Sequence, residues 1–256
     1  FEEDLLWMNR SHSAHQALKC LEDIITTGFN DFNLDLIYGF PLLTDEKWVQ
    51  NISKALSSGA NHLSAYSLTV EPETALFHRI NKGKTPAVSD IQAAKHYEIL
   101  LDEITKKKGW EQYEISNFCY NGAYSKHNTS YWTGKKYLGI GPSAHSFSGK
   151  SRYWNIANNM KYVESINSGI IPHEFENLDP TTRYNESIMT GLRTKWGINP
   201  SEIEKEFGIQ VLLHLQSGLK KFEKYIRKDE SGRYILNREG QLLADHISSE
   251  LFLTDL

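Results

Sequence analysis

Hydrophobic and polar positions along the first part of the chain follow two alternating periods. Apolar residues recur at helical spacing over 14–25, which predicts a helix capped by Ser13. A strand pattern follows over 32–38, a second helix begins after Thr44, and a second strand pattern covers 62–70. Helix, glycine, strand and turn in succession are typical of consecutive βαβ units that form a parallel sheet.

The same rhythm continues after a long connection. A short helix is expected over 75–81, a longer helix begins after Ser89, and a third strand is expected over Gln112–Phe118. A second strand-like run, Tyr137–Phe147, lies beyond the polar segment 119–134. Loops that follow the carboxyl ends of strands carry the chemistry in β/α folds, and long loops are usually functional. Segment 119–134 is therefore expected to be a functional loop at that edge of the sheet.

The second half of the chain reads as mostly helical. Segment 170–179 is interpreted as a linker, which divides the chain into domains 1–169 and 170–256. Three helices followed by a hairpin are typical of a small winged-helix-like domain. The expected elements are an extended piece at 152–155, helices at 158–167, 181–192, 200–207 and 210–227, and a hairpin at 227–236.

Composition restricts the class of protein. The 256 residues include 28 basic and 32 acidic side chains, a net charge of −4 that gives no general attraction to nucleic acid or to anionic membranes. No apolar run approaches the roughly 18 residues that span a bilayer. Cys20 and Cys119 are the only cysteines, so no disulfide framework is expected and a reducing, cytoplasmic compartment is indicated.

Asp35 lies within an otherwise apolar strand pattern. A carboxylate there is costly to bury unless it is paired or lies at the functional edge of the sheet. One interpretation is a structural ion pair with Arg10, and the other is that both residues line a small-molecule site. The following Gly39-Phe40-Pro41 is interpreted as a turn.

The polar segment contains His127, Asn128, Tyr131 and Trp132 within six residues. The aromatic side chains could simply anchor a loop to the core, with the histidine hydrogen-bonded. Alternatively, His127 coordinates a metal or a haem iron while the aromatic rings stack on a flat ligand.

Two further features weigh against common functions. Gly139 to His145 contains G-x-G, but the chain has neither a dinucleotide-binding G-x-G-x-x-G fingerprint nor a phosphate-binding P-loop. The glycines could permit close approach of a ligand or mark a bend. The helix near Val211–Tyr225 lacks a dense basic face, so a winged-helix nucleic-acid-binding regulator stays an alternative based on the C-terminal region alone.

Five ordered stretches together resemble oxygen-independent coproporphyrinogen III oxidase-like radical SAM proteins, in particular their haem-chaperone branch. The resemblance covers nearly the whole chain and is specific because the order is kept. The stretches are LDLIYGFP (34–41), HLSAYSLTVEPET (62–74), YEISNF (113–118), KHNTSYW (126–132) and YLGIGPSAHSF (137–147).

The resemblance implies an α/β fold: the C-terminal half of a partial (β/α)6 TIM-like barrel plus the small, mostly helical domain. The family barrel holds a 4Fe–4S cluster and S-adenosylmethionine (SAM). By motif position, the resemblance implies that SAM is contacted by Arg10, Asp35, Thr69 and His145. It likewise implies haem binding by His127, as the candidate ligand of the haem iron, together with Asn128, Tyr131 and Trp132.

One departure from the family pattern limits these expectations. The C-x-x-x-C-x-x-C cluster motif is absent, and Cys20 and Cys119 are too far apart to replace it. We expect the missing part upstream of Phe1, and residues 1–256 alone are not expected to be active.

The resemblance implies a chaperone that binds haem and delivers it to haem-accepting proteins. The alternative is an oxidase that decarboxylates two propionates of coproporphyrinogen III to form protoporphyrinogen IX. The expected ligands are therefore haem or a porphyrinogen, with neither nucleic acid nor an integral membrane segment involved.

Overall fold

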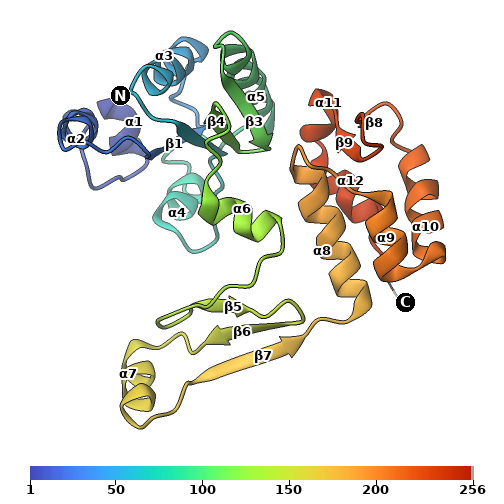
Figure 1. The fold of residues 1–256 in the computed structure, drawn as a ribbon. Coiled ribbons are helices and arrows are strands. Elements are labelled where there is room, and N and C mark those ends of the chain that lie inside the picture. Colours follow the sequence, from blue (N-terminus) through green and yellow to red (C-terminus); the bar gives the residue numbers. More distant parts are fainter. Residues whose placement is uncertain (255–256) are drawn as a thin grey trace. The chain divides into compact units, whose positions relative to one another are not determined.

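The structure is a computed structural model that describes residues 1–254 (Figure 1). The chain folds into two compact units, Phe1–Ser125 and Lys126–Leu256. This division separates the first sheet from everything that follows it. The sequence predicted a different boundary, after residue 169, where the helical C-terminal region was expected to begin. That boundary stays a prediction.

The first unit is built on a four-stranded sheet with the order β1-β2-β4-β3. Strands β1 (Asn33–Tyr38) and β2 (His62–Ser67) are parallel, with Asn33 opposite His62. This pair, with the helix between its strands, is the βαβ unit that the spacing of apolar residues predicts.

The prediction of a single third strand over 112–118 is wrong, because two antiparallel strands occupy this region. Strands β3 (Trp110–Glu114) and β4 (Asn117–Tyr120) form a tight hairpin. The Glu114 carboxylate accepts hydrogen bonds from the Ser116 backbone N–H, at 2.9 Å, and from the Asn117 side-chain amide. These local bonds satisfy the polar groups of the turn and reverse the chain.

The hairpin changes where the chain leaves the sheet. Strand β4 runs antiparallel to β2, and the Tyr120 N–H donates to the Asn61 carbonyl at 2.9 Å, beside the amino end of β2. Segment 119–134 therefore begins at the amino edge of the sheet. The expectation that it begins at the carboxyl edge is wrong, since that expectation required a parallel third strand.

Five helices complete the first unit, and the predicted capping residues are confirmed. The side chains of Ser13, Thr44 and Ser89 each accept a hydrogen bond from the backbone N–H three residues later. At Ser13 the bond is reciprocated by Gln16, which completes a capping box. The helices are α1 (Glu2–Trp7), α2 (Ala14–Thr26), α3 (Asp45–Leu56), α4 (Ala75–Asn81) and α5 (Asp90–Thr105).

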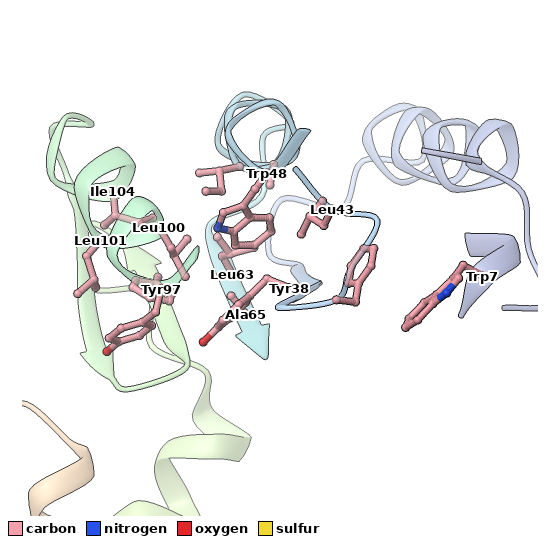
Figure 2. Close-up of a cluster of buried hydrophobic side chains, with 14 residues drawn as sticks. Trp7, Tyr38, Leu43, Trp48, Leu63, Ala65, Tyr97, Leu100, Leu101 and Ile104 are labelled. Atoms are coloured by element: carbon pink, nitrogen blue, oxygen red, sulfur yellow. The ribbon is translucent and has the colours of Figure 1, made fainter. Parts of the chain in front are cut away.

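The core of the first unit lies between one face of the sheet and helices α3 and α5 (Figure 2). Trp48 of α3 and Leu100 of α5 are fully buried against Leu63 of β2. The Trp48 ring lies 5.4 Å from the ring of Tyr38, at the end of β1. Burial of these large side chains is the main favourable contribution to the stability of this unit.

The second unit begins with helix α6 (Lys126–Trp132) and an antiparallel sheet of order β5-β6-β7. The strands are β5 (His145–Phe147), β6 (Ser151–Asn155) and β7 (His173–Asn177), and α7 (Asn159–Asn167) connects the last two. The predicted linker at 170–179 is therefore wrong, because β7 pairs along its whole length with β6. No apolar alternation identified this strand, since all its residues are exposed.

The helical region has the predicted succession of three helices and a hairpin. Tyr184, Ile188 and Leu215 are fully buried in its core, and the Tyr184 hydroxyl donates to the Leu251 carbonyl at 3.1 Å. The elements are α8 (Pro180–Arg193), α9 (Pro200–Phe207), α10 (Ile209–Lys220), β8 (Ile226–Lys228), β9 (Tyr234–Leu236), α11 (Arg238–Gln241) and α12 (Ala244–Glu250).

We expect Gly39→Ala to destabilise the protein more than Gly59→Ala does. Both glycines have positive φ, +80° and +88°, so alanine costs about 1–2 kcal/mol at either site. At Gly39 the added Cβ would also lie 3.0 Å from the Ala93 Cβ and 3.0 Å from the Ser67 Oγ, whereas Gly59 faces open space. Urea unfolding of both variants measures the difference, and equal losses of stability would contradict the close packing at Gly39.

Candidate functional site

The face of the first sheet opposite to helices α3 and α5 is polar. Side chains alternate along β1, so Asn33 and Asp35 lie on the face opposite to Leu34 and Leu36. Asp35 is exposed and accepts a hydrogen bond from the Asn33 amide. Its carboxylate is therefore solvated, and the cost of burial inferred from the apolar strand pattern does not arise.

Arg10 is also exposed, in the turn that follows α1. Within residues 1–254 no ion pair joins Arg10 to Asp35, so the structural ion pair that the sequence left open is not formed. Thr69 is exposed two residues beyond the end of β2, as expected for a residue at a strand end. All three side chains are thus accessible to a ligand.

A buried histidine adjoins Asp35 on the polar face and was not singled out from the sequence. His62 Nδ1 lies 2.6 Å from Asn33 Oδ1, and its Nε2 lies 2.7 Å from the Tyr113 hydroxyl. Because the amide oxygen can only accept, Nδ1 carries the proton and Nε2 accepts from the Tyr113 O–H. Burial lowers the pKa of His62, although the nearby Asp35 carboxylate opposes this effect.

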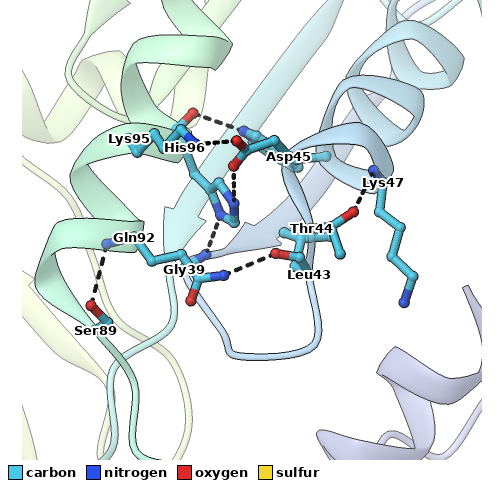
Figure 3. A network of polar contacts seen from close by, with 10 residues as sticks. Gly39, Leu43, Thr44, Asp45, Lys47, Ser89, Gln92, Lys95 and His96 are labelled. Atoms are coloured by element: carbon cyan, nitrogen blue, oxygen red, sulfur yellow. Dashed lines mark hydrogen bonds and ion pairs between the residues drawn. The ribbon is translucent and has the colours of Figure 1, made fainter.

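A second buried histidine holds the turn after β1 (Figure 3). The Gly39 N–H donates to His96 Nδ1 at 3.2 Å, while His96 Nε2 lies 3.4 Å from Asp45 Oδ1. Asp45 also forms an ion pair with Lys95. The histidine is fully buried, and its desolvation lowers its pKa despite the adjacent carboxylate. The Gly39-Phe40-Pro41 turn is therefore fixed by tertiary contacts as well as by its own residues.

The segment with His127, Asn128, Tyr131 and Trp132 is a helix, α6, and its prediction as a loop is wrong. The helical spacing places His127 and Tyr131 on one side, with ring centroids 5.0 Å apart in an edge-to-face arrangement. The Ser130 hydroxyl donates to the Lys126 carbonyl at 2.7 Å, which satisfies the hydroxyl within the helix. His127 and Tyr131 are exposed, and Asn128 and Trp132 are half-buried.

Tyr131 and Trp132 line a groove of about 760 Å³ in the second unit, which we call the α6 groove. Its walls also include Tyr137 and residues of α8 and α9. The guanidinium of Arg193 lies 5.6 Å from the Trp132 ring, a cation–π contact that joins α6 to α8. Pockets of this size are common for small-molecule and cofactor sites. His127 and Asn128 are not among the residues that line it.

His145 lies in β5, exposed, with its ring 6.4 Å from that of Trp154. The strand belongs to a hairpin closed by paired backbone bonds between Tyr137 and Phe147. A Cβ at Gly139 would collide with the His145 carbonyl oxygen. Gly139 therefore permits close approach of backbone to backbone within this hairpin.

Within residues 1–254, no three His, Cys, Asp or Glu side chains converge on a point where a metal ion could be held. Cys20 is exposed and Cys119 is buried, and neither has a second thiol nearby. These residues do not fit a 4Fe–4S cluster, which needs several thiolates. In the same described part, no helix combines the length and the hydropathy needed to cross a bilayer.

Comparison with known proteins identifies the class of fold. A family model for the HemN C-terminal domain matches residues 178–243. The structure is similar to that of coproporphyrinogen III oxidase (HemN) from Escherichia coli, a radical SAM enzyme. The TM-score is 0.71 and the identity 17%, over 98% of this chain and 62% of that one. The predicted fold class, α/β with a small helical C-terminal domain, is confirmed.

The sequence is also similar to curated relatives. It is 32% identical to the heme chaperone HemW of Mycobacterium tuberculosis over 95% of this chain and 60% of that protein. Against the heme chaperone HemW of Bacillus subtilis it is 32% identical, over 96% of this chain and 66% of that protein. It is 39% identical to the mouse mitochondrial radical S-adenosyl methionine domain-containing protein 1, over 56% of this chain and 32% of that protein.

The chain belongs to the radical SAM family that includes HemW and HemN. The predicted family is therefore confirmed. The chain spans 60% and 66% of the length of the two HemW proteins.

We expect acidification to destabilise the first unit through His62 and His96. Burial lowers both pKa values below the usual 6.5, so the folded state favours the neutral imidazoles. Their contribution to stability is complete above pH 6.5 and is lost as the pH falls toward the folded-state pKa values. Urea unfolding at several pH values between about 7.5 and 5.5 measures this loss across the range in which histidine titrates.

The double variant His62→Gln/His96→Gln should show a flatter dependence of stability on pH than the wild type, whatever its absolute stability. His12→Gln, at an exposed histidine, is the control and should keep the wild-type slope. An unchanged slope in the double variant would show that neither buried histidine is responsible.

Proposed function

We propose that this protein is a haem-binding chaperone of the HemW type, which delivers haem to haem-accepting proteins. The observation that carries the proposal is the position of His127 on the exposed side of α6. Within residues 1–254 neither ring nitrogen of His127 makes a hydrogen bond, so each can act as a ligand. Neutral imidazole is a common axial ligand of haem iron. The similarity to proteins named heme chaperone HemW supports the same conclusion.

The neighbouring residues of α6 fit a flat, apolar ligand. Tyr131 contacts His127 edge to face and would limit the rotation of the imidazole. The ring of Trp132 forms part of the wall of the α6 groove, and Asn128 is half-buried on the same helix. We propose that His127 binds the iron, and that Tyr131, Trp132 and Asn128 hold the ligand beside it.

A SAM site in the first unit is the second part of the proposal. Arg10, Asp35 and Thr69 are exposed side chains of types that suit SAM, and His145 is an exposed residue of the second unit. A carboxylate at Asp35 can accept hydrogen bonds from ribose hydroxyls, and the Arg10 guanidinium can pair with a carboxylate. SAM bound with a 4Fe–4S cluster supplies radical chemistry in this family. The cluster does not fit the residues of this chain, so we assign none of them to that chemistry.

An oxidase that acts on coproporphyrinogen III is the alternative, favoured by the fold shared with HemN. Anaerobic incubation of the reconstituted full-length protein with SAM and coproporphyrinogen III distinguishes the two functions. Formation of protoporphyrinogen IX would replace the chaperone proposal with the oxidase.

A nucleic-acid-binding regulator has less support. The third helix of the winged-helix-like region, α10 (IQVLLHLQSGLK), carries only Lys220 and a histidine as basic residues. An unchanged gel mobility of labelled duplex DNA would exclude that function.

We place the protein in the cytoplasm because Cys20 and Cys119 are free thiols.

We expect His127→Ala to weaken haem binding by at least about tenfold, or 1.4 kcal/mol, because it removes the ligand of the iron. Titration of the full-length protein with haem, followed by the Soret absorbance, measures affinity and ligation together. His173→Ala, at an exposed histidine of β7, is the control and should bind haem as the wild type does. If the Soret spectrum and affinity of the His127→Ala variant are unchanged, His127 is not the ligand.

We expect Asp35→Asn to weaken SAM binding by the full-length reconstituted protein about five- to tenfold, since an amide accepts hydrogen bonds more weakly than a carboxylate. Equilibrium dialysis with labelled SAM gives the affinity without any dependence on turnover. Asp31→Asn is the control, because Asp31 is exposed and bonds to the Asn61 amide at 3.1 Å outside β1. Equal affinities of the two variants would remove Asp35 from the SAM site.

A further inference from the structure

Aromatic side chains from several elements line the α6 groove. They are Tyr131, Trp132 and Tyr137, together with Trp196 of the helical region and Phe207 of α9. Tyr131 packs edge to face on Tyr137 with ring centroids 4.8 Å apart, so these two rings form a connected cluster. A lining rich in aromatic rings suits a flat, conjugated ligand better than a flexible aliphatic one.

The charged residues of the groove are nearly all paired with one another. Arg152 bonds to Glu186 at 2.7 Å, Arg183 pairs with Glu206, and Arg233 lies 3.6 Å from Glu202. In these pairs three positive and three negative charges neutralise one another. Among the described residues that line the groove, no carboxylate is left unpaired that would repel an anionic ligand.

Lys135 is the exception. It lines the same groove, and among the described residues it is the one basic lining side chain with no carboxylate partner. Its backbone is fixed at the end of α6, because its N–H donates to the Ser130 carbonyl at 2.9 Å, across Gly134 at a φ of +62°. The Lys135 backbone is therefore fixed three residues after Trp132, and its side chain lines the same groove as the aromatic residues.

We propose that the α6 groove holds the propionate-bearing edge of a porphyrin ring, beside Tyr131, and that Lys135 pairs with one of the propionate carboxylates. The proposal rests on the proposed haem-binding function and adds to it a second anchor, independent of the iron. The aromatic walls recognise the flat macrocycle, the internal ion pairs keep the groove neutral, and Lys135 supplies its single net positive charge. A ligand of the same shape without carboxylates would leave that ammonium unused.

Iron-free protoporphyrin IX tests the groove without any contribution from His127 as an iron ligand. We expect the full-length protein to bind it, observed as a change in porphyrin fluorescence. Lys135→Gln should weaken this binding about five- to tenfold, the effect of losing one charge-assisted hydrogen bond. Lys135→Arg should restore most of it. Lys136→Gln is the matched control and should bind normally, because Lys136 packs beside Gly149 and is not among the lining residues.

Protoporphyrin IX dimethyl ester, at the same detergent concentration, separates the carboxylate contact from ring stacking. The wild type and Lys135→Gln should bind the ester equally, and both should bind it more weakly than the wild type binds the diacid. Equal binding of the diacid by wild type and Lys135→Gln would overturn the proposal, as would a Lys135→Gln defect of the same size with the ester.

His127→Ala distinguishes a failure of this inference from a failure of the proposed function. We expect this variant to lose the Soret change with haem and to keep its affinity for iron-free porphyrin. A protein that binds haem through His127 but does not bind the iron-free ring would overturn the groove assignment alone. A protein that binds neither haem nor the iron-free ring would overturn both proposals.

Discussion

The structure of the first unit depends on the packing of α3 and α5 against one face of the sheet. Trp48 and Leu100 occupy the centre of this contact, and alternation along β1 and β2 directs the remaining side chains to the opposite face. The opposite face is consequently free to carry Asn33, Asp35 and His62. A shift of register by one residue would bury these polar groups under the helices, so the apolar face also fixes the polar one.

The turn at the end of β1 connects the core to the polar face of the sheet, which carries Asp35. His96 belongs to α5, yet its Nδ1 accepts the Gly39 N–H just beyond the strand that carries Asp35. The Trp48 indole N–H donates to the His96 carbonyl at 2.8 Å, which links the turn to α3 as well. A neutral His96 is needed for this bond, because a protonated Nδ1 could not accept.

In the second unit, charged and aromatic contacts keep α6 beside the helical region. Arg193 stacks on Trp132, and Arg152 joins β6 to Glu186 of α8. A groove built from several elements in this way can hold a rigid ligand with little rearrangement, which reduces the entropic cost of binding. The motif with His127 thus lies on a supported helix, which can present a ligand to iron with a defined orientation.

The sequence by itself determined several of the helices, with their caps, and the family. Caps such as Ser13 and Thr44 and the helical spacing of apolar residues predicted α2, α3 and α5 of the first unit, because those signals act within a few residues, whereas α1 was not predicted. Only the tertiary structure decided the β3–β4 hairpin, the helical state of the segment around His127, the solvation of Asp35 and the grouping of Lys135 with the aromatic walls. Each of these depends on partners distant in the chain or on a competition between turn and strand that a short apolar pattern cannot resolve.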